Sequence, residues 1–126
     1  MSDTKKIMVV DDNPTIMKLL ERRLTGEGYK VCTACNGQEG LALAGREMPD
    51  LIVSDVDMPL MDGREMASRL KASVRTSHIP VIFLTAMIKN PESAPQTSGG
   101  YLYLSKSSKP TELLDAIRER LIPISK

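Results

Sequence analysis

Three carboxylates follow an apolar run in the segment LIVSDVDMPLMDG. Asp55, Asp57 and Asp62 fall within eight positions, and no Lys or Arg separates them. A second acidic pair, Asp11 and Asp12, directly follows another short apolar run. A carboxylate can act as a nucleophile or as a ligand for a hard cation such as Mg²⁺. These residues mark the part of the chain in which chemistry is expected.

Two further polar positions follow apolar runs later in the chain. Thr85 ends the run VIFLT, and Ser105 and Lys106 end the run YLYLSK. A hydroxyl and an ammonium that face a carboxylate and a divalent cation form a site that binds a tetrahedral anion. If these positions meet Asp55 in space, they predict a phosphoryl-transfer site in which one carboxylate is the nucleophile.

Five short runs of apolar and β-branched residues predict the strands that must position these groups. They are residues 7–10, 29–33, 51–54, 81–84 and 101–104. The first, third and fourth runs are apolar almost throughout, which is typical of central parallel strands that helices cover on both faces.

Amphipathic stretches with recognisable ends lie between the strands. The predicted helices begin and end near residues 14 and 26, 37 and 47, 64 and 72, and 111 and 122. Asn13 is the expected cap of the first helix, in which Pro14 takes the first position, and Gly26 or Gly28 ends it. The alternation of strand and helix predicts an α/β domain, with an open parallel sheet, helices on both faces and right-handed crossovers.

The segment IKNPESAPQTSGG, residues 88–100, interrupts this alternation between the fourth and fifth strands. Pro91 could open a helix, but Pro95 in the helix interior would cost about 3 kcal/mol. A loop or a single turn is therefore predicted, and a fourth helix between these strands is expected to be short or missing.

The predicted sheet brings the acidic residues together. In open α/β sheets, ligands bind beyond the carboxyl ends of the strands where the strand order reverses. If the order is 2-1-3-4-5, the reversal lies between the strands that end at Asp11 and Asp12 and at Asp55. Two carboxylates ~5 Å apart repel by about 3 kcal/mol at an effective dielectric constant of ~20, so three would not all stay ionised without a cation. Mg²⁺ suits such a site, because it binds one or two carboxylates and keeps several waters.

The bulk composition fits one soluble domain that spans residues 1–126. The chain has 41% hydrophobic and 26% charged residues, an ordinary globular balance. The 17 Lys and Arg nearly cancel the 16 Asp and Glu, so direct nucleic-acid binding is not expected. The first apolar run has only four residues, too few for a signal peptide or a membrane span. We therefore expect a cytoplasmic protein without membrane insertion.

Several chemically capable residues are assigned structural roles. Cys32 and Cys35 form a CxxC pair, but positions three apart in a strand point to opposite faces, and further zinc ligands are missing. Both are expected to be buried or half-buried. The single histidine, His78, is expected to be exposed or locally hydrogen-bonded. Asp62, before a glycine, is expected to be a turn and cap residue.

Four motifs, in this order and spacing, resemble the receiver domains of two-component response regulators: VVDDNPTIMKLL, LIVSDVDMPLMDG, VIFLTA and YLYLSK. The resemblance covers the whole chain. The separations of 43 positions from Asp12 to Asp55 and 30 from Asp55 to Thr85 lie within the range that this family shows. The resemblance implies a flavodoxin-like, doubly wound sheet of five parallel strands in the order 2-1-3-4-5.

The resemblance also implies a chemical role for each acidic residue. Asp55 is the implied phosphoacceptor, which receives a phosphoryl group from the phosphohistidine of a histidine kinase or histidine phosphotransfer protein. Asp12 and Asp55 are the implied direct Mg²⁺ ligands, for which Mn²⁺ can substitute. Asp11 would act largely through water, and Asp57 would supply its backbone carbonyl. Such a protein is a signalling domain that assists its own phosphorylation and dephosphorylation, and is not classed as an enzyme.

The remaining implied residues respond to the phosphoryl group. Lys106 would pair with the phosphoryl oxygens, and Thr85 would hydrogen-bond the group once it forms. Tyr103 resembles the aromatic residue that swings in behind Thr85. This movement would switch a surface that binds a downstream target or an output domain, neither of which the sequence identifies. Family members commonly follow the lysine with proline, whereas Ser107 stands here. Lys106 keeps the family's spacing and Lys109 does not. Because the proline after the lysine is missing, a weaker or slower phosphorylation response is predicted.

Three other functions fit parts of the pattern. A haloacid-dehalogenase-like phosphatase would use Asp55 as nucleophile and Asp57 as general acid, but its strand normally comes first in the chain. A flavodoxin-like FMN carrier would need a phosphate-binding turn, and the acidic turn DDNPT would repel phosphate. A degenerate receiver would act only as a protein-interaction module, although this chain retains all the side chains of the acceptor site.

Overall fold

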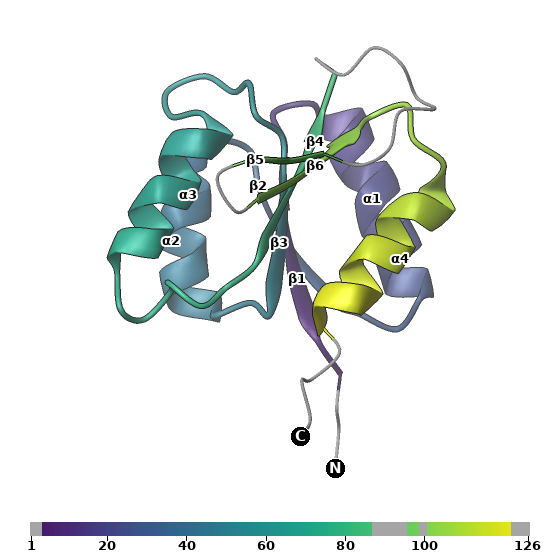
Figure 1. The fold of residues 1–126 in the computed structure, drawn as a ribbon, viewed down its shortest axis with the longest axis horizontal. Coiled ribbons are helices and arrows are strands. Elements are labelled where there is room, and N and C mark those ends of the chain that lie inside the picture. Colours follow the sequence, from purple (N-terminus) through teal and green to yellow (C-terminus); the bar gives the residue numbers. More distant parts are fainter. Residues whose placement is uncertain (1–3, 87–95, 99–100, 122–126) are drawn as a thin grey trace.

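The computed structural model describes residues 4–86, 96–98 and 101–121 (Figure 1). The elements are β1 (Lys6–Val10), α1 (Pro14–Gly26), β2 (Lys30–Ala34), α2 (Gly37–Glu47), β3 (Leu51–Ser54), α3 (Gly63–Ala72), β4 (Val81–Thr85), β5 (Gln96–Ser98), β6 (Tyr101–Ser105) and α4 (Pro110–Leu121). The five predicted strands and four predicted helices are all present, with ends that agree to within about one residue.

The sheet has the predicted order. Its strands run β2-β1-β3-β4-β6-β5, and all neighbours are parallel except β5 and β6. Because β6 is the predicted fifth strand, the parallel part has the order 2-1-3-4-5, and the doubly wound α/β fold is confirmed. The strand order reverses between β1 and β3, which pair so that Val10 of β1 lies opposite Ser54 of β3.

The strand β5 was not predicted. Thr97 pairs with Leu102, so β5 adds an antiparallel strand to the edge at β6. The prediction of a loop or single turn for residues 88–100 is therefore wrong at residues 96–98, because unpaired backbone groups of an edge strand can bind even a short segment. The described part of the chain has no helix between β4 and β6. Residues 87–95 and 99–100 lie outside the described residues.

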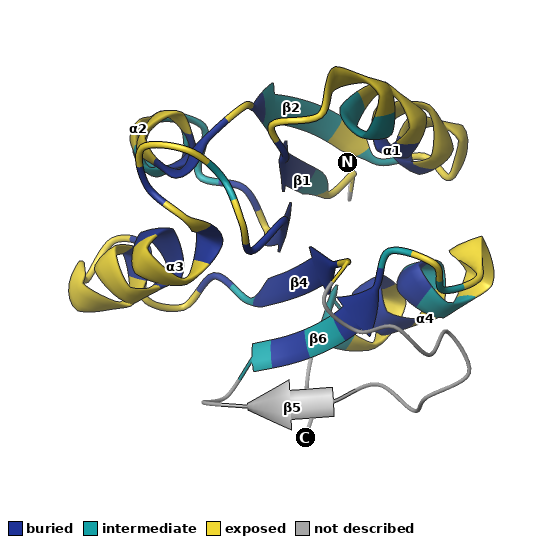
Figure 2. Cartoon of the chain, turned by 90° about the horizontal axis from the view of Figure 1, so that it is seen from above, coloured by how far each residue is buried: buried dark blue, intermediate teal, exposed yellow. Residues whose placement is uncertain are grey.

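Helices cover both faces of the sheet, as Figure 2 shows: α1 and α4 lie on one face, and α2 and α3 on the other. Alternate residues of β1 supply the two cores, because successive side chains of a strand point to opposite faces. Ile7 and Val9 pack with α1 and α4, whereas Met8 and Val10 pack with α2 and α3. This double burial explains the unbroken apolar runs.

Three polar side chains begin the helices next to the acidic edge. Asn13 accepts hydrogen bonds from the amides of the first turn of α1, as predicted. Asn36 accepts one at the start of α2, and Asp62 accepts one from the amide of Glu65 at 2.8 Å. Such caps satisfy amides that have no partner within the helix. The expected cap role of Asp62 is confirmed.

The remaining structural assignments are confirmed in part. His78 is exposed and Cys32 is half-buried. Cys35 is exposed, contrary to expectation, because it follows the last residue of β2, and its thiol donates to Glu39 Oε1 at 3.1 Å. In the described ranges, no helix combines the length and apolarity needed to cross a lipid bilayer.

Candidate functional site

Backbone hydrogen bonds extend beyond the ends of the central strands and place two aspartates at one edge. The amide of Asp55, after β3, donates to the carbonyl of Val10 on β1 at 2.8 Å. The amide of Asp11, after β1, donates to the carbonyl of Ala34 on β2 at 3.1 Å. Both residues therefore keep the sheet's register where the strand order reverses.

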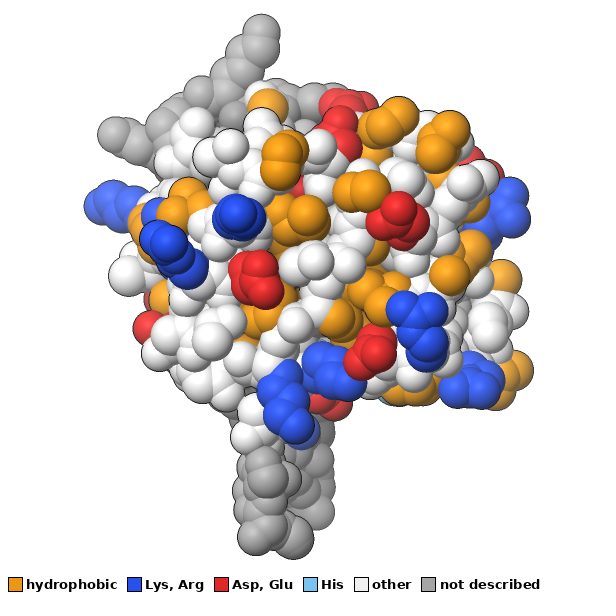
Figure 3. Space-filling view, turned by 180° about the vertical axis from the view of Figure 1, so that it is seen from behind, with side chains coloured by type: hydrophobic (Ala, Val, Ile, Leu, Met, Phe, Trp, Pro, Cys, Tyr) orange, Lys and Arg blue, Asp and Glu red, His pale blue; other side chains and the backbone are white. Residues whose placement is uncertain are grey.

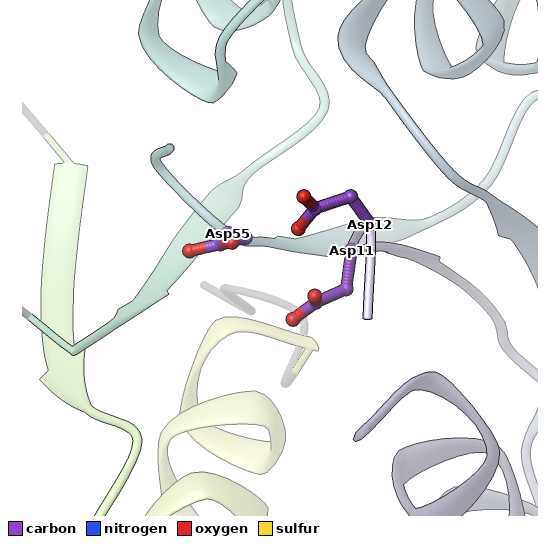
Figure 4. Close-up of side chains that lie close together, drawn as sticks. All are labelled: Asp11, Asp12 and Asp55. Carbon is purple, nitrogen blue, oxygen red and sulfur yellow. The ribbon is translucent and has the colours of Figure 1, made fainter. Parts of the chain in front are cut away.

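The predicted acidic cluster forms at this edge. Carboxylate oxygens of Asp11, Asp12 and Asp55 all lie within 4.8 Å of one another, and Figure 4 shows the three side chains close together. Asp11 and Asp55 are buried, with exposed fractions of 2% and 7%, whereas Asp12 is exposed. The cluster is thus open to solvent on the side of Asp12, and its donor set suits a hard divalent cation.

Lys106 joins the cluster from the end of β6. Its ammonium nitrogen lies 3.1 Å from Asp11 Oδ2 and 3.3 Å from Asp55 Oδ2. Its amide donates to the carbonyl of Thr85 at 3.0 Å, which ties the loop after β6 to the end of β4. The structure therefore brings Lys106, the lysine chosen from the spacing, to the acidic residues, and the Lys106–Ser107 peptide is trans.

The ionisation of Asp55 and Lys106 reflects both burial and mutual attraction. Burial raises the pKa of the Asp55 carboxyl, while the charge of Lys106 opposes the rise. Burial acts to lower the pKa of Lys106, but the hydrogen bond and charge of Asp11, together with Asp55, outweigh it and raise the pKa. The lysine is thus held as a cation, and its single charge only partly offsets three carboxylates.

Asp55 is held rigidly by its neighbours. The amide of Val56 donates to Oδ1 at 2.8 Å, while Oδ2 faces Lys106. The hydroxyl of Ser54 donates to the backbone carbonyl of Asp55 at 2.7 Å. The start of α3 packs so closely that a Cβ on Gly63 would collide with that carbonyl oxygen. Glycine is therefore required here for the close approach, and the carboxylate is fixed before any reaction.

Thr85 lies at the same edge of the sheet, and Tyr103 lies one strand away from it. Thr85 is buried with 1% exposure at the end of β4 and pairs with Ser105. Tyr103 is half-buried, and its ring stacks on Phe83 with 5.0 Å between centroids. Arg64 Cζ lies 5.5 Å from the centroid of the Tyr103 ring.

Asp57 is exposed and does not belong to the acidic cluster. Sequence reasoning missed the residues that support the site, namely Ser54, Gly63, Arg64 and Phe83. The glycine after Asp62 was the one visible signal, because Asp-Gly marks a turn, but the contact with Asp55 depends on how α3 packs. Phe83 belongs to an apolar run and could be assigned only to the core.

The site and fold match one family of known proteins. The family model described as "Response regulator receiver domain" matches residues 7–118. Response regulator PleD of Caulobacter vibrioides is 48% identical over 82 residues, which cover 65% of this chain and 18% of PleD. Transcriptional regulatory protein GlrR of Escherichia coli is 40% identical over 116 residues, or 91% of this chain and 26% of GlrR. The chain thus spans about a quarter or less of these two relatives.

Solved structures agree with the sequence comparison. Chemotaxis response regulator CheY4 of Vibrio cholerae superposes with a TM-score of 0.80 at 31% identity, and the match covers 94% of this chain and 99% of that one. The receiver domain of hybrid histidine kinase CckA superposes with a TM-score of 0.76 at 27% identity over 93% of this chain and 99% of that one. These matches favour a receiver over the phosphatase and FMN-carrier alternatives.

Proposed function

The chain belongs to the response regulator receiver domain family of two-component systems, and from that premise we propose that Asp55 accepts a phosphoryl group from a phosphohistidine. The donor would be a histidine kinase or a histidine phosphotransfer protein. The observation that carries the proposal is the position of the Asp55 carboxylate, which is buried, fixed by Val56 and Lys106, and beside two other carboxylates.

The donor set fits a divalent cation, and we assign Mg²⁺, with Mn²⁺ as a substitute. Asp11, Asp12 and Asp55 would hold it, with Asp11 acting largely through water and Asp57 contributing its backbone carbonyl. When bound, the ion supplies positive charge that neutralises the carboxylates and attracts phosphoryl oxygens. The burial that raises the pKa of Asp55 also makes its ionised form dependent on nearby positive charge.

The transfer step balances on the atoms of Asp55 and the donor. A carboxylate oxygen of Asp55 forms a bond to phosphorus while the bond from phosphorus to the donor's imidazole nitrogen breaks. The imidazole keeps the electron pair of that bond and takes up a proton. Lys106 is placed to attract the phosphoryl oxygens, because its ammonium already lies beside Asp55 Oδ2.

Phosphorylation would then change the surface next to β4 and β6. The hydroxyl of Thr85 would donate to the phosphoryl group and draw its loop inward, and Tyr103 would follow. The added negative charge is comparable to that of a phosphate ester, about −1.5 to −2. A charge of this size can bias a surface that has two conformations. We assign residues 1–126 to a single receiver unit that presents this surface to a downstream target or output domain.

The test is phosphorylation in the absence of a kinase. Purified protein is incubated with Mg²⁺ and acetyl phosphate, and intact-mass and peptide mass spectrometry report a phosphoryl adduct and its position. We expect one adduct, on Asp55, that is lost on treatment with hydroxylamine. Asp55→Asn is the matched control, because it keeps the shape of the side chain. An intact, folded protein that forms no acyl phosphate on Asp55 would instead be a degenerate receiver, and the proposal would be wrong.

A further inference from the structure

A polar pocket lies at the opposite end of the sheet from the acidic cluster. It has a volume of about 200 Å³ and is lined by the end of α3, the loop after it, the first residues of β4 and β6, and Arg120 of α4. Val81 and Tyr101 begin the two strands whose other ends carry Thr85 and Lys106. The pocket is therefore a separate site.

Basic side chains dominate the polar lining of this pocket. Lys71, His78 and Arg120 all line it, and no Asp or Glu does among the described residues. None of the three forms an ion pair with a carboxylate of the part of the chain that the structure describes. This concentration is local, because the whole chain carries a net charge of only +1. Figure 3, which shows the face opposite that of Figure 1, has acidic and basic side chains interspersed.

Hydrogen bonds fix the wall that carries His78. Thr76 is buried, and its hydroxyl donates to the carbonyl of Leu70 at 2.6 Å. The amide of Thr76 donates to the carbonyl of Ser73, and the amide of Ile79 donates to the carbonyl of Thr76. The segment after α3 therefore forms hydrogen-bonded turns. The wall is thus built before any ligand arrives, which reduces the entropy lost on binding.

Lys71 is held at the pocket by an aromatic ring. Its ammonium nitrogen lies 4.8 Å from the centroid of Tyr101, whose hydroxyl donates to the carbonyl of Ala67 at 3.5 Å. The contact of a cation with a ring at an exposed site is weaker than a hydrogen bond to a charged group. An anion in the pocket would therefore hold this ammonium better than the ring does.

The size and lining of the pocket select the ligand class. A volume of about 200 Å³ is below the roughly 300–1,000 Å³ of pockets for drug-sized ligands, so the ligand is compact. Side chains of Leu70, Ile79 and Pro80 give the pocket an apolar part beside the basic groups. We propose that this pocket binds a small phosphomonoester, with its phosphate against Lys71, His78 and Arg120 and its organic part against the apolar wall. The proposal does not depend on phosphorylation of Asp55.

The test is a titration of the full chain with phenyl phosphate, followed by ¹H–¹⁵N NMR. EDTA keeps divalent ions away from the acidic cluster, which then repels phosphate, and sodium chloride keeps the ionic strength constant. We expect saturable shifts at residues 71, 76–79, 101 and 120. Saturable shifts centred instead on Asp11, Asp55 and Lys106, or no saturable shift at all, would overturn the proposal.

Two arginines on α4 provide a matched pair of variants. Arg120 lines the pocket, whereas Arg118 pairs with Glu27 and Asp115 outside it. Arg120→Gln should weaken phenyl phosphate binding about tenfold or more, as loss of a charge-assisted hydrogen bond implies, and Arg118→Gln should leave it unchanged. Both spectra must first match the wild-type fold, and Lys71→Gln replaces Arg120→Gln if the latter does not fold. Equal affinity in the folded pocket variant and in wild type would contradict the proposal.

Two further probes define the chemistry. Benzoate has the same ring with a carboxylate, and benzyl alcohol has it without charge. We expect phenyl phosphate to bind more tightly than benzoate, and benzyl alcohol not to bind detectably. Equal binding of phenyl phosphate and benzoate would overturn the assignment to phosphomonoesters, and equal binding of benzyl alcohol would show that the basic residues are not used.

Discussion

The ammonium nitrogen of Lys106, after β6, lies 3.3 Å from Oδ2 of Asp55, after β3, although β4 lies between these two strands in the sheet. The lysine therefore touches the proposed phosphoacceptor before phosphorylation and is placed to follow the new charge when the group arrives. Its other contact, with Asp11 at 3.1 Å, keeps it in the site.

Replacement of this lysine should uncouple phosphorylation from the conformational change. In Lys106→Ala, NMR shifts at Thr85 and Tyr103 on addition of beryllofluoride and Mg²⁺ should be largely lost, because no cation reaches the fluoride atoms from β6. Lys109→Ala is the control, since Lys109 is exposed and lies outside the cluster. If the shifts vanished only in Lys109→Ala, the assignment of the lysine would be wrong.

The raised pKa of Asp55 predicts a pH-dependent cost to the fold. Burial favours the protonated carboxyl in the folded state, so Asp55 favours folding below its unfolded pKa of about 3.9, and this contribution is lost as the pH rises through the folded value. Without divalent ions, Asp55→Asn should therefore have a larger free energy of unfolding than wild type at neutral pH. The difference should shrink as the pH falls toward about 4.

Urea unfolding at several pH values in EDTA measures this difference directly. Asp50→Asn would not be a suitable control, because Asp50 accepts a hydrogen bond from the amide of Lys6 at 2.8 Å. Asp57→Asn is suitable, because Asp57 is exposed and outside the cluster. The free energy of unfolding of Asp55→Asn, relative to that of wild type, could instead rise as the pH falls. That result would show that the charge of Lys106 outweighs burial at Asp55.

The acidic cluster could be predicted from sequence because strand ends obey a simple rule. Asp11, Asp12 and Asp55 each follow an apolar run, and the carboxyl ends of adjacent parallel strands share one edge. Lys106 could be placed because it follows the fifth predicted strand and keeps the spacing of the family that the chain resembles. The contact of Gly63 with Asp55 and the stack of Tyr103 on Phe83 could not be predicted, because they depend on the packing of α3 and on which face each strand presents. Pairing of β5 with β6 also depends on tertiary structure, because β5 consists of three polar residues, Gln96 to Ser98, that give no apolar strand pattern.

Divalent ions should stabilise the protein through the exposed member of the cluster. Mg²⁺ at about 100 times its dissociation constant adds roughly 2.7 kcal/mol to the free energy of unfolding. Asp12→Asn should weaken Mg²⁺ binding, measured by calorimetry or by the rise in Tm, because one of three clustered carboxylates is lost. Asp57→Asn should change it little, because only the backbone carbonyl of Asp57 is expected to contribute. An equal loss in both variants would show that Asp57 binds through its side chain.

The close packing at Gly63 gives a stability prediction with an internal control. In Gly63→Ala the new Cβ meets the carbonyl of Asp55, the hydroxyl of Ser54 and the ring of Phe83, and overpacking of this kind costs about 1–3 kcal/mol. Gly45→Ala, in α2, has no atom within 4 Å of the new Cβ and should stabilise the protein by about 0.5–1 kcal/mol. Urea unfolding measures both, and a neutral Gly63→Ala would mean that α3 shifts without cost.

The ring of Tyr103 contacts two groups: its centroid lies 5.0 Å from the centroid of Phe83 and 5.5 Å from Cζ of Arg64. Arg64 should therefore help to set the position of this ring. Arg64→Ala removes the cation–π attraction, which at exposed sites contributes about 0.5–1 kcal/mol. The observed position of the Tyr103 ring should therefore be favoured less in this variant. The aromatic ¹³C shifts of Tyr103 without phosphodonor should then move part of the way toward those of the beryllofluoride state. Arg69→Ala, on the same helix, breaks only the surface pair with Glu65 and should leave the Tyr103 signals in place. Identical Tyr103 spectra in Arg64→Ala and wild type would show that Phe83 alone holds the ring, because that stack is the contact that remains when the guanidinium is removed.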